Sequence, residues 1–122
     1  MIRERIRKAV LVVIGLLFLA AIPLVMFFSR DAAVAMLMSI YATLGVFLLL
    51  SVSDPAANRS LISFAGWANL AHAGVMAVQV YRHAIESREL AGVALFTIVG
   101  LALIAIVPAK QTTTQVSKAR AA

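Results

Sequence analysis

The chain has 122 residues, of which 63% are hydrophobic and 13% are charged, and it contains no cysteine. A soluble domain is about 45–50% apolar and about 25% charged, so this composition excludes an ordinary soluble domain and indicates an integral membrane protein. The formal net charge is +6. The basic residues lie at the chain ends and beside apolar segments, which argues against nucleic acid as a partner and for contact with membrane lipids.

Four apolar segments dominate the sequence, and each is close to the ~20 residues that cross a ~30 Å hydrocarbon core as a helix. The predicted spans cover about residues 9–28, 32–52, 61–81 and 90–107. Because the connections are short, sequential helices are expected to be antiparallel neighbours. The sequence therefore predicts an all-α, up-down-up-down four-helix transmembrane bundle over residues 1–108. The polar residues 109–122 are expected to form a flexible cytoplasmic tail.

Polar residues in the connections indicate where the helices begin. Ser29 or Asp31 can cap the second helix, and Asn58 or Ser60 can cap the third. Pro55 disfavours helical structure at the residue before it. These residues place the helix boundaries inside the short connections.

The distribution of lysine and arginine predicts the orientation. One side of the membrane receives eight basic residues: Arg3, Arg5, Arg7, Lys8, Arg59, Lys110, Lys118 and Arg120. The other side receives three: Arg30, Arg82 and Arg88. The positive-inside rule then predicts a multi-pass protein of the bacterial inner membrane with both termini in the cytoplasm. A cleavable signal peptide ending near Ala20 and Ala21 is the alternative, although the apolar segment exceeds the usual length of about 7–15 residues.

The third apolar segment carries an unusual polar stripe. Asn69, His72, Met76, Gln79 and His83 follow a spacing of three and four residues, so they share one face of a helix. One interpretation is that these side chains make hydrogen bonds between helices, worth about 0.6 kcal/mol each. The expected partners are Ser39, Tyr41, Thr43 and Thr97.

Small residues on the third and fourth segments predict close helix packing, because they let backbones approach each other in lipid. The residues expected at helix contacts are Gly66, Ala73, Gly74, Gln79, Gly92 and Gly100.

His72 is also a candidate ligand-binding residue, since ionisable groups inside the membrane often mark functional sites. It could be an axial ligand to a haem or chlorin, although His83 lies about 16 Å further along the helix and cannot share the same metal. Alternatively, His72, Asn69 and Tyr41 could hold a quinone or another small apolar ligand. Trp67 is then either a pocket wall or an interfacial aromatic residue.

Every aspartate and glutamate lies outside the predicted spans, which argues against ion-coupled transport. The sequence also lacks recognisable catalytic motifs. These features favour a non-enzymatic accessory or structural subunit of a larger inner-membrane assembly, with other membrane subunits or further copies of the chain as partners. The alternative is a quinone-, haem- or chlorin-binding, redox-associated membrane protein that uses His72.

One long stretch resembles a known group of proteins. The run "YATLGVFLLLSVSDPAANRSLISFAGWANLAHAGVMAVQ" (41–79), and within it "ANRSLI" (57–62) and "AHAGVMAVQ" (71–79), resembles small, uncharacterised bacterial four-span membrane proteins grouped as a domain of unknown function. More loosely, the architecture is similar to DoxX-like proteins, some of which are associated with redox complexes and quinones. The first resemblance implies no known activity, and the second is an analogy of fold that transfers no functional residue.

Overall fold

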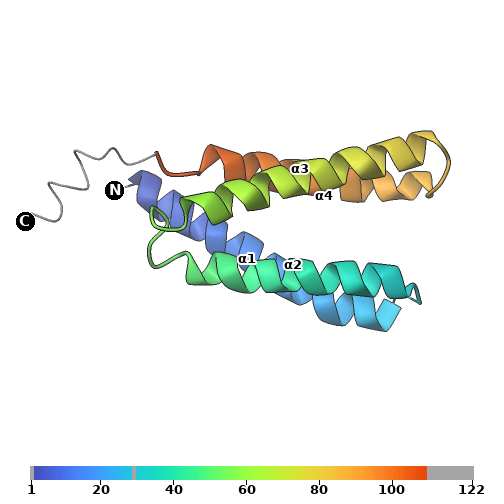
Figure 1. Ribbon diagram of the computed structural model, residues 1–122, viewed down its shortest axis with the longest axis horizontal. Coiled ribbons are helices and arrows are strands. Elements are labelled where there is room, and N and C mark those ends of the chain that lie inside the picture. Colours follow the sequence, from blue (N-terminus) through green and yellow to red (C-terminus); the bar gives the residue numbers. More distant parts are fainter. Residues whose placement is uncertain (1, 29, 110–122) are drawn as a thin grey trace, which may run out of the picture.

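The computed structural model describes residues 2–28 and 30–109, which form an all-helical protein (Figure 1). The elements are α1 (Ile2–Phe28), α2 (Ala32–Leu50), α3 (Arg59–Tyr81), the short 3₁₀ helix η1 (Ser87–Glu89) and α4 (Leu90–Ala105). From residue 110 onward, the predicted tail lies outside the described residues.

Within this part of the chain, three helical segments are long and apolar enough to cross a membrane. They are Ala32–Leu50, Arg59–Tyr81 and Ser87–Ala105. Their outer surfaces carry large exposed hydrophobic side chains such as Ile40, Phe64 and Ile98. Surfaces of this kind are stable against lipid rather than water, which supports a membrane protein.

The helix starts have local causes. α1 begins at Ile2, although the apolar segment begins near residue 9, so its basic first turns are also helical. The ion pair of Glu4 with Arg7, one turn later, stabilises these turns. Asp31 caps α2, since its side chain accepts a hydrogen bond from the Ala33 N–H at 2.9 Å. Asn58 occupies the cap position of α3, but its side-chain amide donates to the Asp54 carbonyl at 2.8 Å instead of capping the helix.

The four helices form two antiparallel hairpins rather than one evenly packed bundle. α1 packs along α2, and α3 packs along α4, whereas the contacts between the two hairpins are much less extensive. Figure 1 shows the hairpins close together at the end that holds the N-terminus and the α2–α3 connection, and apart at the opposite end. We call these the closed end and the open end.

Each hairpin is held together at a pair of glycines. A Cβ atom on Gly45 would lie 2.8 Å from the Gly15 carbonyl oxygen, and one on Gly100 would lie 2.8 Å from the Gly66 carbonyl oxygen. Real Cβ atoms do not approach this closely, so the crossings require glycine at positions 45 and 100. A Cβ atom on Gly15 or Gly66 would lie 3.0 or 3.1 Å from the facing carbonyl oxygen, so both sides of each crossing are tight. The packing predicted for Gly66 and Gly100 therefore occurs within the second hairpin.

The two hairpins repeat the same pattern of buried positions, of which Phe96 is partly buried. One register aligns α1 with α3, and another aligns α2 with α4. The paired positions are Leu11 with Ile62, Ile14 with Ala65, Gly15 with Gly66, Phe18 with Asn69, Tyr41 with Phe96, Leu44 with Val99, Gly45 with Gly100, and Leu48 with Leu103. Both hairpins begin at the closed end, so the repeat is parallel rather than inverted.

The closed end is fixed by a core layer and by two arginines. The layer consists of one fully buried side chain from each helix: Leu11, Leu48, Ile62 and Leu103. The Arg7 Nε donates to the Ile106 carbonyl at 2.7 Å, and the Arg59 Nε donates to the Pro108 carbonyl at 2.8 Å. These bonds satisfy carbonyl groups just after the end of α4. The carbonyl groups at the end of a helix have no N–H partner within the helix, so side chains can bond to them.

Candidate functional site

Four aromatic rings, one from each helix, lie about two to three helical turns from the core layer toward the open end. The Tyr41 ring centroid is 5.5 Å from Phe18, 5.4 Å from His72 and 5.3 Å from Phe96. The His72 and Phe96 centroids are 4.3 Å apart. The edge-on and tilted geometries are those that aromatic quadrupoles favour. We call these four rings the aromatic layer.

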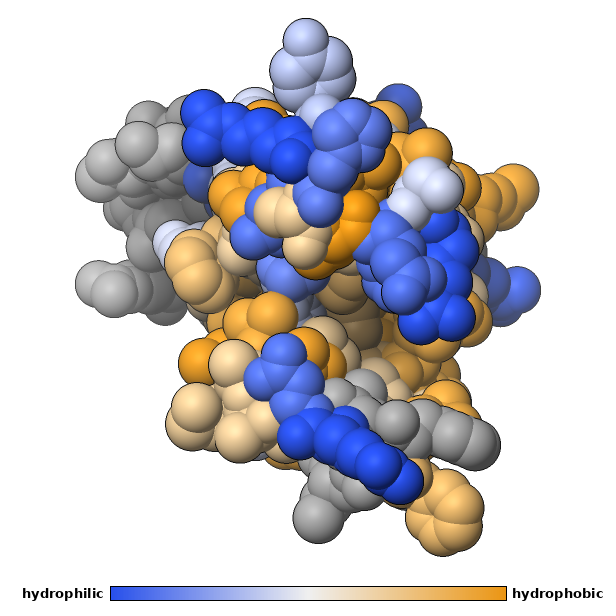
Figure 2. Space-filling view, turned by 90° about the vertical axis from the view of Figure 1, so that its right-hand side faces the viewer, coloured by the Kyte–Doolittle hydropathy of each residue, from blue (hydrophilic) through white to orange (hydrophobic). Residues whose placement is uncertain are grey.

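Between the hairpins, beyond the aromatic layer, lies a cleft of ≈ 830 Å³. The first hairpin contributes apolar side chains: Leu24, Val34, Leu37 and Met38. The second hairpin and its connection contribute a more polar wall: His72, Met76, Gln79, Ile85, Glu86, Arg88, Glu89, Gly92 and Phe96. Figure 2 looks onto the open end and shows hydrophilic groups set apart from one another, with hydrophobic residues between them. The volume and the lining of the cleft are typical of a site for a small ligand.

His72 lies at the floor of this cleft. Its ring is half-buried and packs against Phe96 and Tyr41. Within the described residues, its ring nitrogens make no hydrogen bond to the protein. A neutral imidazole has one donor and one acceptor, so His72 can offer both to a molecule in the cleft.

The repeat shows that the fold does not require a polar residue at this position. In the first hairpin, the position equivalent to His72 is Ala21, and the position equivalent to Asn69 is Phe18. The first hairpin therefore has apolar side chains at both of these positions. His72 and Asn69 are departures from the repeat, and they occur beside and beneath the cleft. This asymmetry favours a functional role over a purely structural one.

Asn69 is fully buried one helical turn below His72. Its side-chain amide donates to the Ala65 carbonyl at 2.6 Å, but its Oδ1 atom has no hydrogen-bond partner among the described residues. An unpaired buried acceptor costs about 1–3 kcal/mol. Asn69 does not line the cleft.

The predicted hydrogen bonds between helices are wrong. Ser39 donates to the Met36 carbonyl, Thr43 donates to Ser39, and Thr97 donates to the Val93 carbonyl, at 2.6, 3.0 and 2.7 Å. Each donor is thus satisfied by the preceding turn of its own helix, as hydroxyl groups in apolar helices commonly are.

The remaining predicted positions separate into different surroundings. Trp67 is 62% exposed on the outer surface of α3 and lies outside the cleft. Ala73 is buried, and a Cβ atom on Gly92 would lie 3.0 Å from the Met76 Cε. Gly74 and Gln79, expected at helix contacts, are exposed instead. A Cβ atom on Gly74 would meet nothing within 4 Å.

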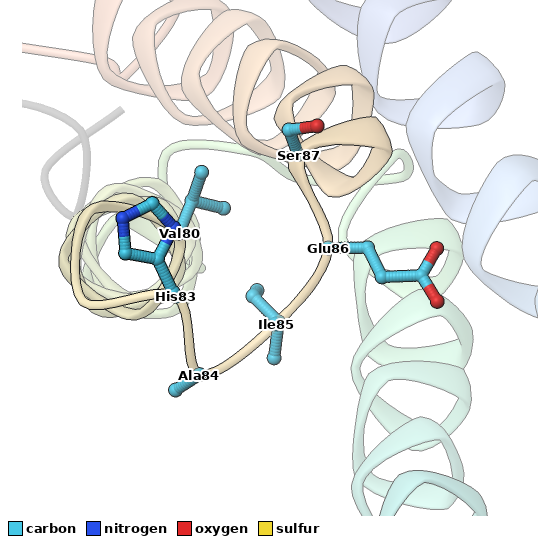
Figure 3. A pocket seen from close by; sticks show the side chains of 6 residues that line it. All are labelled: Val80, His83, Ala84, Ile85, Glu86 and Ser87. Carbon is cyan, nitrogen blue, oxygen red and sulfur yellow. The ribbon is translucent and has the colours of Figure 1, made fainter.

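His83 does not continue the stripe into the cleft. Figure 3 shows it beside Val80 at the end of α3, while the Glu86 carboxylate points away from it on the other side of the loop. His83 has a φ angle of 58°, and its N–H and that of Ala84 bond back to Val80 and Gln79 at 3.0 and 2.8 Å. This is a Schellman motif, in which the left-handed residue ends the helix.

The packing around His72 leaves little space for a tetrapyrrole against its ring. The rings of Tyr41 and Phe96 pack against His72, and the small residue Gly74 lies on the opposite and exposed face of α3. Among the described residues, no group of three histidines or acidic residues could hold a metal ion.

Sequence reasoning missed the polar rim of the cleft. Glu86, Glu89 and Phe96 have no role in the sequence-based prediction, and Arg88 is used there only to predict orientation. Two glutamates flanking one arginine next to a polar helix stripe were the available signal.

The fold defines a small helical protein with membrane-spanning character and an inter-hairpin cleft. The chain belongs to a Family of unknown function (DUF6632), whose match covers residues 4–121. None of the curated proteins matches the chain, and none of the solved structures does.

Proposed function

We propose that the chain is a four-span protein of the bacterial inner membrane that binds a small lipophilic ligand in its cleft and does not transform it. The fourth span is α1, with 27 residues. Its counterpart in the repeat is α3, which is apolar enough to cross a membrane, and it packs along α2, which is also apolar enough. The basic residues at the closed end support a cytoplasmic location for that end.

The observation that carries the ligand proposal is the presence of His72, without a hydrogen-bond partner among the described residues, where the repeat has Ala21. A quinone or another lipophilic molecule with one polar group would receive a hydrogen bond from His72 and cover apolar walls with its remainder.

The test is to purify the full chain from native membranes in mild detergent and to identify retained lipophilic molecules by mass spectrometry. The wild type is expected to retain one compound near stoichiometry. His72→Ala should reduce its retention roughly fivefold, the effect of losing about 1 kcal/mol of hydrogen bonding. Trp67→Ala on the outer surface is the matched control and should retain it. Equal retention by all three proteins would refute the role of His72.

A second candidate is an accessory subunit that docks through the outer surface of α3. The supporting observation is the exposed patch of Ala71, Gly74 and Val78, where small side chains let another helix approach closely. Gly74→Leu should then abolish co-purification of a stoichiometric membrane partner or second copy, without changing ligand retention. An unchanged set of co-purifying proteins would exclude this docking surface.

A further inference from the structure

We propose that the ligand is a bipolar amphiphile: a positively charged group held at the rim by Glu86 and Glu89, a neutral hydrogen-bonding group at His72, and an apolar spacer between them. This inference rests on the proposed ligand-binding function and specifies the chemistry of the ligand. Three features of the cleft carry it, namely the charge of the rim, the polarity of the floor and the distance between them.

The rim is acidic although the whole chain is strongly basic. The charged residues that line the described cleft are Glu86, Arg88 and Glu89. Arg88 Nε lies 2.8 Å from Glu86 Oε2 and 3.9 Å from Glu89 Oε1, so one guanidinium is shared by two carboxylates. The side chains that line the rim therefore have an excess of one negative charge, while Arg30 and Arg82 of the same end lie outside the lining. It complements a cation and repels an anion.

The ion pairs at the rim are weak enough to rearrange. The side chains of Arg88 and Glu86 are 77% and 71% exposed, and that of Glu89 is 45% exposed. Exposed pairs of this kind contribute little to stability because solvent screens them. A cationic group entering the cleft can consequently take over a carboxylate without a large loss elsewhere. Glu86 already projects from its loop on the side away from His83 (Figure 3).

The floor and the rim are separated by apolar wall. Along α4, the rise from Phe96, beside His72, to Glu89 is roughly 10 Å, and along α3 the rise from His72 to Tyr81 is roughly 14 Å. Between these levels, Leu37 and Met38 face Met76 across the cleft. Flexible thioethers adapt to the irregular surface of an alkyl chain. An extended chain of about ten carbons has the length that joins the two polar ends.

The experiment uses the full chain in nanodiscs of zwitterionic lipid, with a photoreactive alkyl diazirine as an apolar probe of the cleft. Labelled peptides are located by mass spectrometry, and competitors are ranked by the concentration that halves labelling. The three competitors are ω-hydroxydecyltrimethylammonium, decyltrimethylammonium, which lacks the hydroxyl, and ω-hydroxydecyl sulfonate, which reverses the charge. The bipolar cation is expected to compete at roughly fivefold lower concentration than either of the others.

Two variants separate the two ends of the ligand. E86Q/E89Q should remove the advantage of the cation over the sulfonate and keep the advantage of the hydroxyl. His72→Phe, which retains an aromatic ring in the layer, should do the opposite. Glu4→Gln at the closed end is the charge control and should change neither ratio. Labelling of the cleft by the diazirine verifies that each variant is folded.

The outcomes distinguish this inference from the function on which it rests. Cleft labelling with equal competition by all three amphiphiles overturns the bipolar ligand and leaves a less selective lipophilic site. Failure of the diazirine to label the cleft of the wild type overturns both. Cross-linking of the cleft to another polypeptide would show that a helix occupies it and would also overturn the inference.

Discussion

Asn69 and His72 lie on adjacent turns of α3, but they differ in burial and in access to the cleft. His72 borders an open cleft, where a ligand or water can satisfy its ring nitrogens. Asn69 is fully buried, and its Oδ1 atom has no partner among the described residues. A ligand or water could reach this atom only if the surrounding side chains moved. The cost of Asn69 is therefore intrinsic to the folded chain, whereas that of His72 depends on what fills the cleft.

Replacing Asn69 with leucine should stabilise the protein. The substitution removes a buried acceptor that lacks a partner, and the repeat already accommodates an apolar side chain at the equivalent Phe18. We expect a gain of about 1 kcal/mol in the free energy of unfolding, measured by denaturant titration in mixed micelles.

Phe18→Leu is the matched variant in the other hairpin, and a loss of about 1 kcal/mol is expected there because it removes packing volume. If Asn69→Leu were instead destabilising by a similar amount, Oδ1 would have a partner in solution, such as a buried water.

The polar stripe itself could be predicted from its spacing. Which of its residues line the cleft and which do not could not be predicted. Periodicity places His72, Met76 and Gln79 on one face, and these three do line the cleft. It cannot place the end of α3, which the left-handed backbone of His83 sets. Periodicity also cannot show that the hydroxyl groups donate to carbonyls of their own helix rather than to a neighbouring helix, since either bond satisfies the donor.

Among the elements, the two glycine crossings have a stronger effect on the architecture than the helix compositions do. They let the backbones of each hairpin touch, so each hairpin behaves as one packed unit. The contacts between hairpins contain no such glycine pair among the described residues. The cleft forms where the close packing is absent.

A larger residue at a crossing should therefore weaken its hairpin. In Gly100→Val, the Cβ atom alone would lie 2.8 Å from both the Gly66 carbonyl oxygen and the Leu70 Cγ. We expect a loss of about 1–3 kcal/mol, because the helices must move apart. Thermal unfolding in detergent provides the measurement.

Gly74→Val is the control on the same hairpin, since a Cβ atom there meets nothing within 4 Å. Its effect on the isolated protein should stay within about 0.5 kcal/mol. Similar losses in the two variants would mean that a general effect of the larger side chain on the helix, rather than the crossing, determines the result.

The ranges of the helices were largely predictable, because long apolar segments and short polar connections leave few alternatives. α1 is the exception, since its first turns are charged and their helicity depends on local pairs such as Glu4 with Arg7. The pairing into hairpins follows from the short connections. The unequal contacts between hairpins do not, because they depend on which glycines of different helices meet.

At the scale of the whole molecule, the two arginines of the closed end have different roles. One joins the two hairpins, and the other joins α3 to the segment after α4 within the second hairpin. Arg7 belongs to α1 but bonds to the segment after α4, so it bridges the hairpins. Arg59 bonds from α3 to the same segment. Together with the core layer, they define the end about which the hairpins diverge.

Arg7→Met should loosen the contact between hairpins more than Arg59→Met does. Each variant loses one charge-assisted hydrogen bond, with an expected cost of about 1–2 kcal/mol. Only the first of these bonds joins the two hairpins. Because the chain lacks cysteine, spin labels can be attached to Val34→Cys and Leu90→Cys alone, and their distance distribution can be measured by pulsed electron resonance.

The distribution should broaden in Arg7→Met and remain close to that of the parent in Arg59→Met. Arg5→Met, which alters an exposed arginine of the same turn of α1, controls for the loss of charge. Equal broadening in all three variants would assign the effect to membrane electrostatics instead of the bond to Ile106.

The divergence of the hairpins also affects the bilayer in which the protein is proposed to lie. A body that is narrow at the closed end and wide at the open end displaces more lipid area from one leaflet than from the other. In a flat membrane this difference stores elastic energy, and curvature that expands the leaflet at the wide end releases it. In the proposed orientation, with the closed end in the cytoplasm, the protein would collect where the membrane bulges outward.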